Sequence, residues 1–234
     1  MPAAAPAGWQ RVVTSDFNET TALGSWPGPE AARFWKNRQR GPDTSGRATY
    51  DSSKTVSEAN GILDVWVHSE GAERYVAAPV SAIGATHGAR IAVCMRADRI
   101  PGYKIAFLLW PTEGDGNSLG EIDYPESKLD GPPVTANAFM HYAPEPSDGR
   151  RQDWFDSGAF LQDWHAYTIE WNPKASPPYV RFYVDGRLIG EATEFVPWVP
   201  MFYVMQIESY LGDEPLPASS QGHVQVDWAT IEVP

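Results

Sequence analysis

The sequence contains one cysteine, few basic residues and no long apolar run. The single cysteine, Cys94, excludes a disulfide within the chain. Asp and Glu number 30 against 18 Lys and Arg, which gives a net charge of −12. No basic block offsets this charge, so we expect no nucleic-acid partner, because nucleic acids bind positive surfaces. No stretch reaches the roughly 18 apolar residues of a membrane span, and residues 1–7 show no signal-peptide pattern.

The composition favours a turn-rich β protein with many aromatic side chains. The chain has 10 Trp, and its 21 Pro and 20 Gly are spread throughout. Short runs alternate apolar and polar residues, as in residues 61–68, where Leu63, Val65 and Val67 share one face of an expected strand. No amphipathic helix of useful length is visible. These features predict an antiparallel β-sandwich.

The most informative segment is residues 120–126, Gly-Glu-Ile-Asp-Tyr-Pro-Glu. Because side chains alternate along a strand, Glu121 and Asp123 point to the same face. In a regular strand Glu126 would point to the other face. One extra residue in a β-bulge would bring it back, and Pro125 lies where such a bulge is tolerated. The sequence therefore predicts a row of three carboxylates on one sheet face.

Neighbouring carboxylates repel one another, and this repulsion gives them different protonation states. A retaining glycosidase needs such a pair: an ionised nucleophile and a protonated acid that donates to the leaving oxygen. Two other interpretations remain open from the spacing alone. The acids could belong by chance to a solvated strand, or they could bind a divalent metal ion through their oxygens.

These residues resemble the signature of glycoside hydrolase family 16, Glu-x-Asp-x-x-Glu in its bulged form. Residues 164–171 and 181–186, the latter ending in an Asp-Gly turn, resemble scaffold strands of the same family. The resemblance covers residues 14–234 and implies one catalytic domain after an N-terminal tail, residues 1–13. The implied fold is all-β: an antiparallel β-jelly-roll sandwich of two curved sheets with an open concave cleft.

The resemblance also implies roles for particular residues. Glu121 is similar to the family's nucleophile and Glu126 to its acid/base, while Asp123 would orient the pair. Catalysis would need no cofactor. Many family members bind a structural Ca²⁺, which implies a possible site at Asp227 and the backbone near Gly61; an exposed, unliganded Asp227 is the alternative.

The expected substrate-binding residues are aromatic or polar side chains near the acid row. They are Trp110, His141, Gln206, Trp35 and Trp154. Trp110 fits core packing equally well, and His141 has a structural role as its alternative.

The sequence departs from the family pattern at several cleft positions. Leu108 stands where members usually carry Trp, Gln206 takes the place of an Asn, and Glu208-Ser209 replaces a glycine pair. We therefore do not transfer a substrate from close relatives.

The resulting functional hypothesis is a retaining glycoside hydrolase acting on a β-linked polysaccharide, most similar to an endo-β-1,3-glucanase. One alternative is a hydrolase or transglycosylase acting on galactan or another cell-wall glycan. A second is a carbohydrate-binding module without catalysis. We expect a monomer with a polysaccharide or oligosaccharide as its partner, and an extracellular location inferred from this function.

Overall fold

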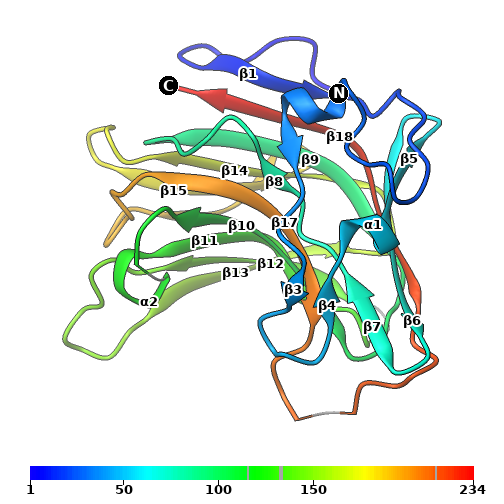
Figure 1. Ribbon diagram of the computed structural model, residues 1–234. Coiled ribbons are helices and arrows are strands. Elements are labelled where there is room, and N and C mark those ends of the chain that lie inside the picture. The colour runs from blue at the N-terminus through cyan, green and yellow to red at the C-terminus, as the bar shows by residue number, and fades with distance from the viewer. Residues whose placement is uncertain (115, 132–133, 214) are drawn as a thin grey trace.

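The computed structural model describes residues 1–114, 116–131, 134–213 and 215–234. Within these residues the strands form two curved sheets that pack face to face (Figure 1). The strands of the outer sheet are β1 (Gln10–Ser15), β3 (Gly41–Pro42), β4 (Thr49–Tyr50), β5 (Val56–Ala59), β6 (Ile62–Glu70), β7 (Glu73–Val76), β9 (Ala89–Ala97), β14 (His165–Asn172), β15 (Tyr179–Val184), β16 (Arg187–Ala192) and β18 (Gly222–Val233). The strands of the cleft sheet are β2 (Trp35–Lys36), β8 (Val80–Ser81), β10 (Tyr103–Pro111), β11 (Glu121–Lys128), β12 (Thr135–His141), β13 (Gln152–Phe160) and β17 (Met201–Ser209).

The strand order brings segments that are distant in the sequence together. The outer sheet runs β16-β15-β14-β9-β18-β6-β7-β4-β3, with β1 paired to β18 and β5 to β6. The cleft sheet runs β13-β12-β11-β10-β17-β8-β2. Short helices are η1 (Ala31–Arg33), α1 (Ser52–Thr55) and α2 (Gly116–Leu119). None of the helices in the described part of the chain is long and apolar enough to cross a membrane.

The core lies between the two sheets, and strand alternation decides which residues enter it. In β10, the odd-numbered residues from Tyr103 to Leu109 are at most 1% exposed. The even-numbered residues from Lys104 to Trp110 line the concave side of the cleft sheet instead. One strand thus supplies both the core and the floor of the cleft.

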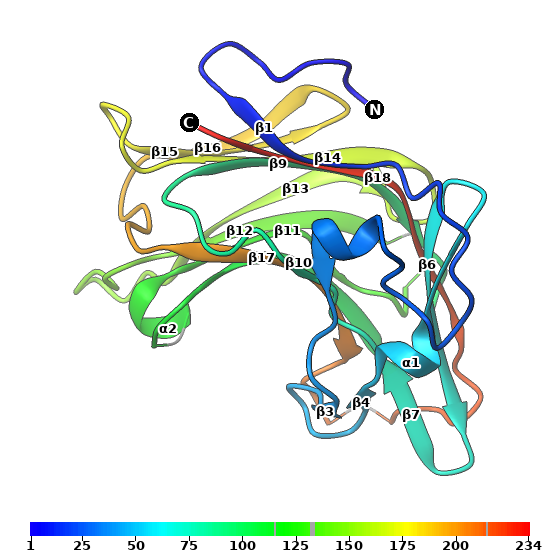
Figure 2. The same cartoon turned by 45° about the horizontal axis from the view of Figure 1, so that its top comes forward.

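Two segments flank the concave side, where β3 and β4 lie near one end of the strands and α2 near the other (Figure 2). Asp43, just after β3, holds its segment in place because its Oδ2 accepts a hydrogen bond from the Ser209 backbone N–H at 2.8 Å. Arg47, in the same segment as Asp43, donates a hydrogen bond to the Tyr210 carbonyl oxygen. The segment after β3 is therefore attached to the end of β17.

The expected all-β sandwich of two curved sheets is confirmed. One local expectation differs from the structure. Strand β1 begins at Gln10, within the expected tail of residues 1–13, because Gln10 pairs with Val233 of β18.

Candidate active site

The predicted bulge is present in β11. Asp123 pairs with Leu108 of β10, and Glu126 pairs with Ala106, so three steps along β11 match two steps along β10. The same shift occurs against β12. The extra residue at Tyr124-Pro125 returns Glu126 to the concave face, where Glu121 and Asp123 already point.

Local packing explains why the bulge forms at this place. The ring of Tyr124 enters the core, where it meets Tyr167 edge-on at a centroid distance of 5.3 Å and Phe182 at 5.7 Å. Gly120, directly before β11, has φ +84°, and a Cβ there would lie 2.5 Å from Cγ of Pro197. Glycine is therefore required directly before Glu121.

The three acids line a cavity of about 570 Å³ on the concave face. The cavity also receives Trp110, His141 and Gln206, so the structure places three of the expected substrate-binding residues beside the acids. Its lining residues are Arg38, Pro42, Asp43, Thr44, Lys104, Ala106, Leu108, Trp110, Glu121, Asp123, Glu126, His141, Phe202, Val204, Gln206, Glu208 and Leu211.

Burial and mutual repulsion raise the pKa of two of the acids. Burial, followed by the charge of Asp123, raises the pKa of Glu121 to about 9. Asp123 is 1% exposed, and burial together with the charge of Glu126 raises its pKa well above the usual range. Nε2 of His141 lies 3.3 Å from Oδ2 of Asp123. At neutral pH the Glu121–Asp123 pair therefore holds a proton.

The same side chains also offer donor atoms to a metal ion. Glu121, Asp123 and His141 each place one donor atom within 4.8 Å of the others, the one such cluster among the residues that the structure describes. A metal ion binds deprotonated carboxylates, and mutual repulsion raises the pKa of clustered carboxyls whether or not a cation belongs between them. The divalent-metal interpretation of the acid row therefore stays a prediction beside the acid–base one.

The sequence analysis did not identify an ion pair beside the acids. Nζ of Lys104 lies 3.3 Å from Oε1 of Glu126 and 3.2 Å from Oε1 of Glu208. Tyr50 donates a hydrogen bond to Oε2 of Glu208 at 2.8 Å. The sequence contains one indication of this ion pair: Lys104 is the single charged residue in the otherwise apolar segment that forms β10.

Trp154 lies outside the main cavity but on the same sheet face. It pairs with Phe139, which pairs with Asp123, and paired residues share a face. Its side chain is 57% exposed, and its Nε1 donates to Oδ1 of Asn137 at 3.1 Å. Trp154 therefore offers an aromatic surface two strands away from the acids.

The substrate-binding prediction for Trp35 is wrong. Trp35 is 1% exposed, and its Nε1 donates to Oγ of Ser15 at 2.8 Å. It packs against Phe17 and Tyr203 in the core. In β2 the alternation turns Trp35 toward the core, so it contributes to stability and does not reach a substrate.

The possible calcium site stays a prediction. Gly61 lies in the β5–β6 turn with φ +77°, and a Cβ there would lie 3.5 Å from Oδ1 of Asn18 and 3.7 Å from the Asp16 carbonyl oxygen. Oxygen atoms of this kind suit Ca²⁺. Asp227 is exposed at a bulge of β18, between Val226 and Trp228.

A β-sandwich with an acid row in a concave cleft is the architecture of a glycoside hydrolase. The model of glycosyl hydrolases family 16 matches residues 49–230, and the chain belongs to this family. A search of curated proteins found no match.

Solved structures of several glucanases share the fold at low sequence identity. The endo-1,3-beta-glucanase from Streptomyces sioyaensis has a TM-score of 0.79 and 19% identity over 99% of both chains. The laminarinase from Rhodothermus marinus has a TM-score of 0.73 and 19% identity over 96% of this chain and 97% of its own. A beta-1,3-glucanase from Mycobacterium marinum has a TM-score of 0.71 and 17% identity over 97% of this chain and 100% of its own.

Proposed function

We propose that this glycoside hydrolase cleaves β-1,3-linked glucan within the chain and retains the anomeric configuration, with Glu121 as nucleophile and Glu126 as acid/base. The observation that carries the proposal is the bulge of β11, which brings both glutamates to one face with Asp123 between them. The structural likeness to proteins described as an endo-1,3-beta-glucanase and a laminarinase supports glucan as the substrate.

Asp123 prepares the nucleophile in this mechanism. Burial disfavours the charged form of a carboxyl group, and Asp123 is more completely buried than Glu121. We therefore place the shared proton on Asp123, which donates it in a hydrogen bond to Glu121 and leaves Glu121 ionised. His141, 3.3 Å from Oδ2 of Asp123, fixes the orientation of that carboxyl group.

The reaction proceeds by double displacement. The Glu121 carboxylate attacks the anomeric carbon while protonated Glu126 donates its proton to the departing glycosidic oxygen. Glu126, now ionised, then takes a proton from a water molecule, and the resulting hydroxide attacks the same carbon and releases Glu121. Each step inverts the anomeric carbon, so the product has the configuration of the substrate.

Trp110 and Gln206 provide complementary contacts for a sugar in the cavity. The indole of Trp110 offers an apolar face for a sugar ring, and the Gln206 amide offers hydrogen bonds to hydroxyl groups. Trp154 would bind a sugar further along the polymer. Polysaccharides do not cross membranes, so we propose an extracellular enzyme. One chain supplies all three acids, which supports a functional monomer.

Two variants test the assigned roles on glucan polymer and on an oligoglucoside with an activated aryl leaving group. Glu121→Gln should lose turnover of both substrates, because no nucleophile remains. Glu126→Gln should lose polymer cleavage but still release the aryl group in a first-turnover burst, since that group leaves without protonation. Glu113→Gln, an exposed glutamate outside the cavity, is the matched control. Wild-type turnover by Glu121→Gln would remove Glu121 from the role.

A substrate panel then decides the specificity. Release of oligosaccharides from β-1,3-glucan is the expected result. Preferential cleavage of galactan, or products longer than the starting oligosaccharides, would favour the alternative hydrolase or transglycosylase activity.

A further inference from the structure

The floor of the cleft contains a buried cation that the double displacement does not use. The Lys104 side chain is 12% exposed and lies between two carboxylates, Glu126 at 3.3 Å and Glu208 at 3.2 Å. Glu208 is 1% exposed and is itself fixed by the hydrogen bond from Tyr50. The proposed acid/base therefore shares one ammonium group with a second, fully buried glutamate.

Strand register holds this arrangement in place. Lys104 and Glu208 are paired residues of β10 and β17. Ala106, two residues further along β10, pairs with Glu126 on the other side. Because β10 lies between β11 and β17, the Lys104 side chain reaches a carboxylate on each neighbouring strand.

Lys104 remains charged in this environment. Burial alone would lower the pKa of Lys104, but the carboxylates of Glu126 and Glu208 outweigh burial and raise it. A positive charge therefore lies next to Glu126 at neutral pH.

We propose that Lys104 and Glu208 act as an opposed pair that sets the protonation of Glu126. Lys104 favours the ionised form of Glu126, and Glu208 weakens this effect because it draws the same ammonium group away from Glu126. The inference rests on the proposed function, because it takes Glu126 as the acid/base. Both are positioning residues, since they act through Glu126.

Other charged groups line the cavity of the acid row, or a second cavity beside it that Glu126 also lines, and remain in every variant tested. They are Glu121, Asp123 and Lys128 of β11, Asp130 after β11, His141 of β12, and Arg38 and Asp43 of the segment beside β3. Differences between variants therefore isolate the contribution of Lys104 and Glu208.

The test is the basic limb of the pH profile of kcat/KM, which reports the ionisation of the general acid in the free enzyme. Lys104→Met should move this limb to higher pH by about one unit, because a cation that favours the carboxylate is lost. Glu208→Gln should move it to lower pH, because Lys104 then acts on Glu126 alone.

The double variant Lys104→Met/Glu208→Gln leaves no unpaired buried charge and keeps the test usable if a single variant fails to fold. Its limb should coincide with that of Lys104→Met, because Glu208 acts on Glu126 through Lys104 and has no further effect once Lys104 is gone.

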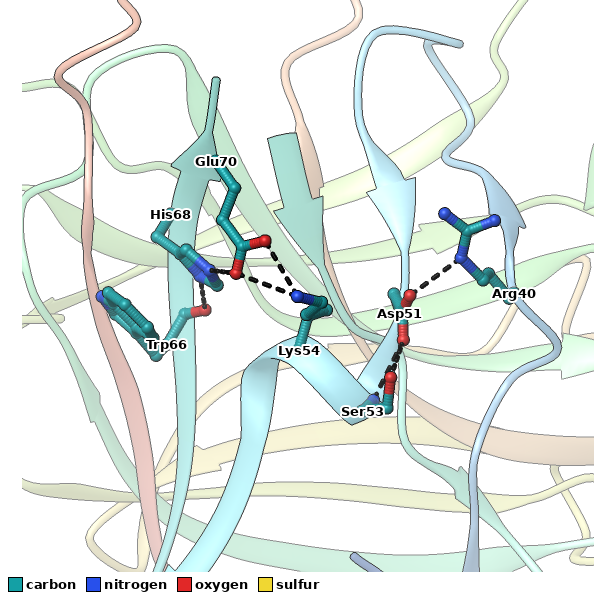
Figure 3. Close-up of polar contacts among 7 residues, drawn as sticks. All are labelled: Arg40, Asp51, Ser53, Lys54, Trp66, His68 and Glu70. Carbon is teal, nitrogen blue, oxygen red and sulfur yellow. Dashed lines mark hydrogen bonds and ion pairs between the residues drawn. The ribbon is translucent and has the colours of Figure 1, made fainter. Parts of the chain in front are cut away.

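Lys54→Met is the matched control. Lys54 pairs with Glu70 at 2.8 Å, alongside other polar contacts of β6 and α1 (Figure 3), and it lines neither cavity. This variant loses the same charge but should leave the limb in place.

Opposite displacements in the two single variants support the proposal. Lower Tm and lower kcat with an unmoved limb in both variants would overturn it, because the pair would then be only structural. Wild-type polymer turnover by Glu126→Gln would refute the proposed role of Glu126 itself, and the inference would fall with it.

Discussion

Neutralising Glu121 should stabilise the fold at neutral pH although it abolishes turnover. In the folded protein the pKa of Glu121 is raised to about 9 by burial and by Asp123, whereas in an unfolded chain it is about 4.3. Between these values the folded Glu121–Asp123 pair binds one shared proton, placed on Asp123 above, that the two carboxyls release in the unfolded chain. Stability is therefore greatest below the unfolded pKa and falls as the pH rises toward 9.

The size of the effect follows from the interval between the unfolded pKa and the working pH. Each pH unit corresponds to about 1.4 kcal/mol, so the interval up to pH 7 would cost about 4 kcal/mol for Glu121 alone, and we expect about 3 kcal/mol because Asp123 shares the proton. For a chain of this length that corresponds to roughly 6–12 °C in Tm. Glu121→Gln keeps the volume and removes one buried carboxyl of the pair, together with its repulsion of the other, so it should recover most of this difference.

Urea unfolding followed by Trp fluorescence measures the effect. Wild type, Glu121→Gln and the exposed control Glu113→Gln are compared at about pH 4, 7 and 8.5. The expected result is equal stability of all three near pH 4 and a growing advantage of Glu121→Gln at higher pH. A wild type as stable as Glu121→Gln near pH 7, or a difference independent of pH, would refute the reasoning.

Three further predictions concern residues of the core, the cleft and the outer sheet. Trp35→Ala should lower the free energy of unfolding by about 3–5 kcal/mol and leave KM unchanged. Trp154→Ala should leave Tm unchanged and raise KM for long glucans about fivefold, equal to about 1 kcal/mol. A raised KM in Trp35→Ala alone would contradict the buried position of Trp35. Gly120→Ala should lower kcat by at least about tenfold, because a shift of Glu121 spoils its alignment; full activity would contradict the steric argument. Chelation with EDTA should lower Tm by a few degrees if Ca²⁺ binds at Asp227, without changing kcat at moderate temperature. Asp227→Asn should abolish that change in Tm, and a loss of kcat on chelation would contradict the metal-free mechanism.

The sequence was sufficient to predict the acid row and the bulge beneath it. A bulge at Pro125 was predicted because it brings Glu126 to the face of Glu121 and Asp123, and the register of β11 against β10 and β12 confirms it. The alternating runs likewise predicted the β-sandwich.

The remaining parts of the site depend on long-range register. Trp35 illustrates this, because an aromatic residue suits the core and the cleft equally and only its pairing with Ser81 shows which face it takes. The contact of Lys104 with Glu208 joins β10 to β17, which lie far apart in the chain. No local pattern specifies such a pairing.

The most direct test of the central claim is the site of covalent modification by a 2-deoxy-2-fluoro oligoglucoside with an activated leaving group. The fluorine slows both steps by destabilising the oxocarbenium-like transition state, and the leaving group restores the first step, so a glycosyl-enzyme accumulates. Peptide mass spectrometry should find the sugar on Glu121. A label on Glu126, or no label together with an inverted product, would contradict the account.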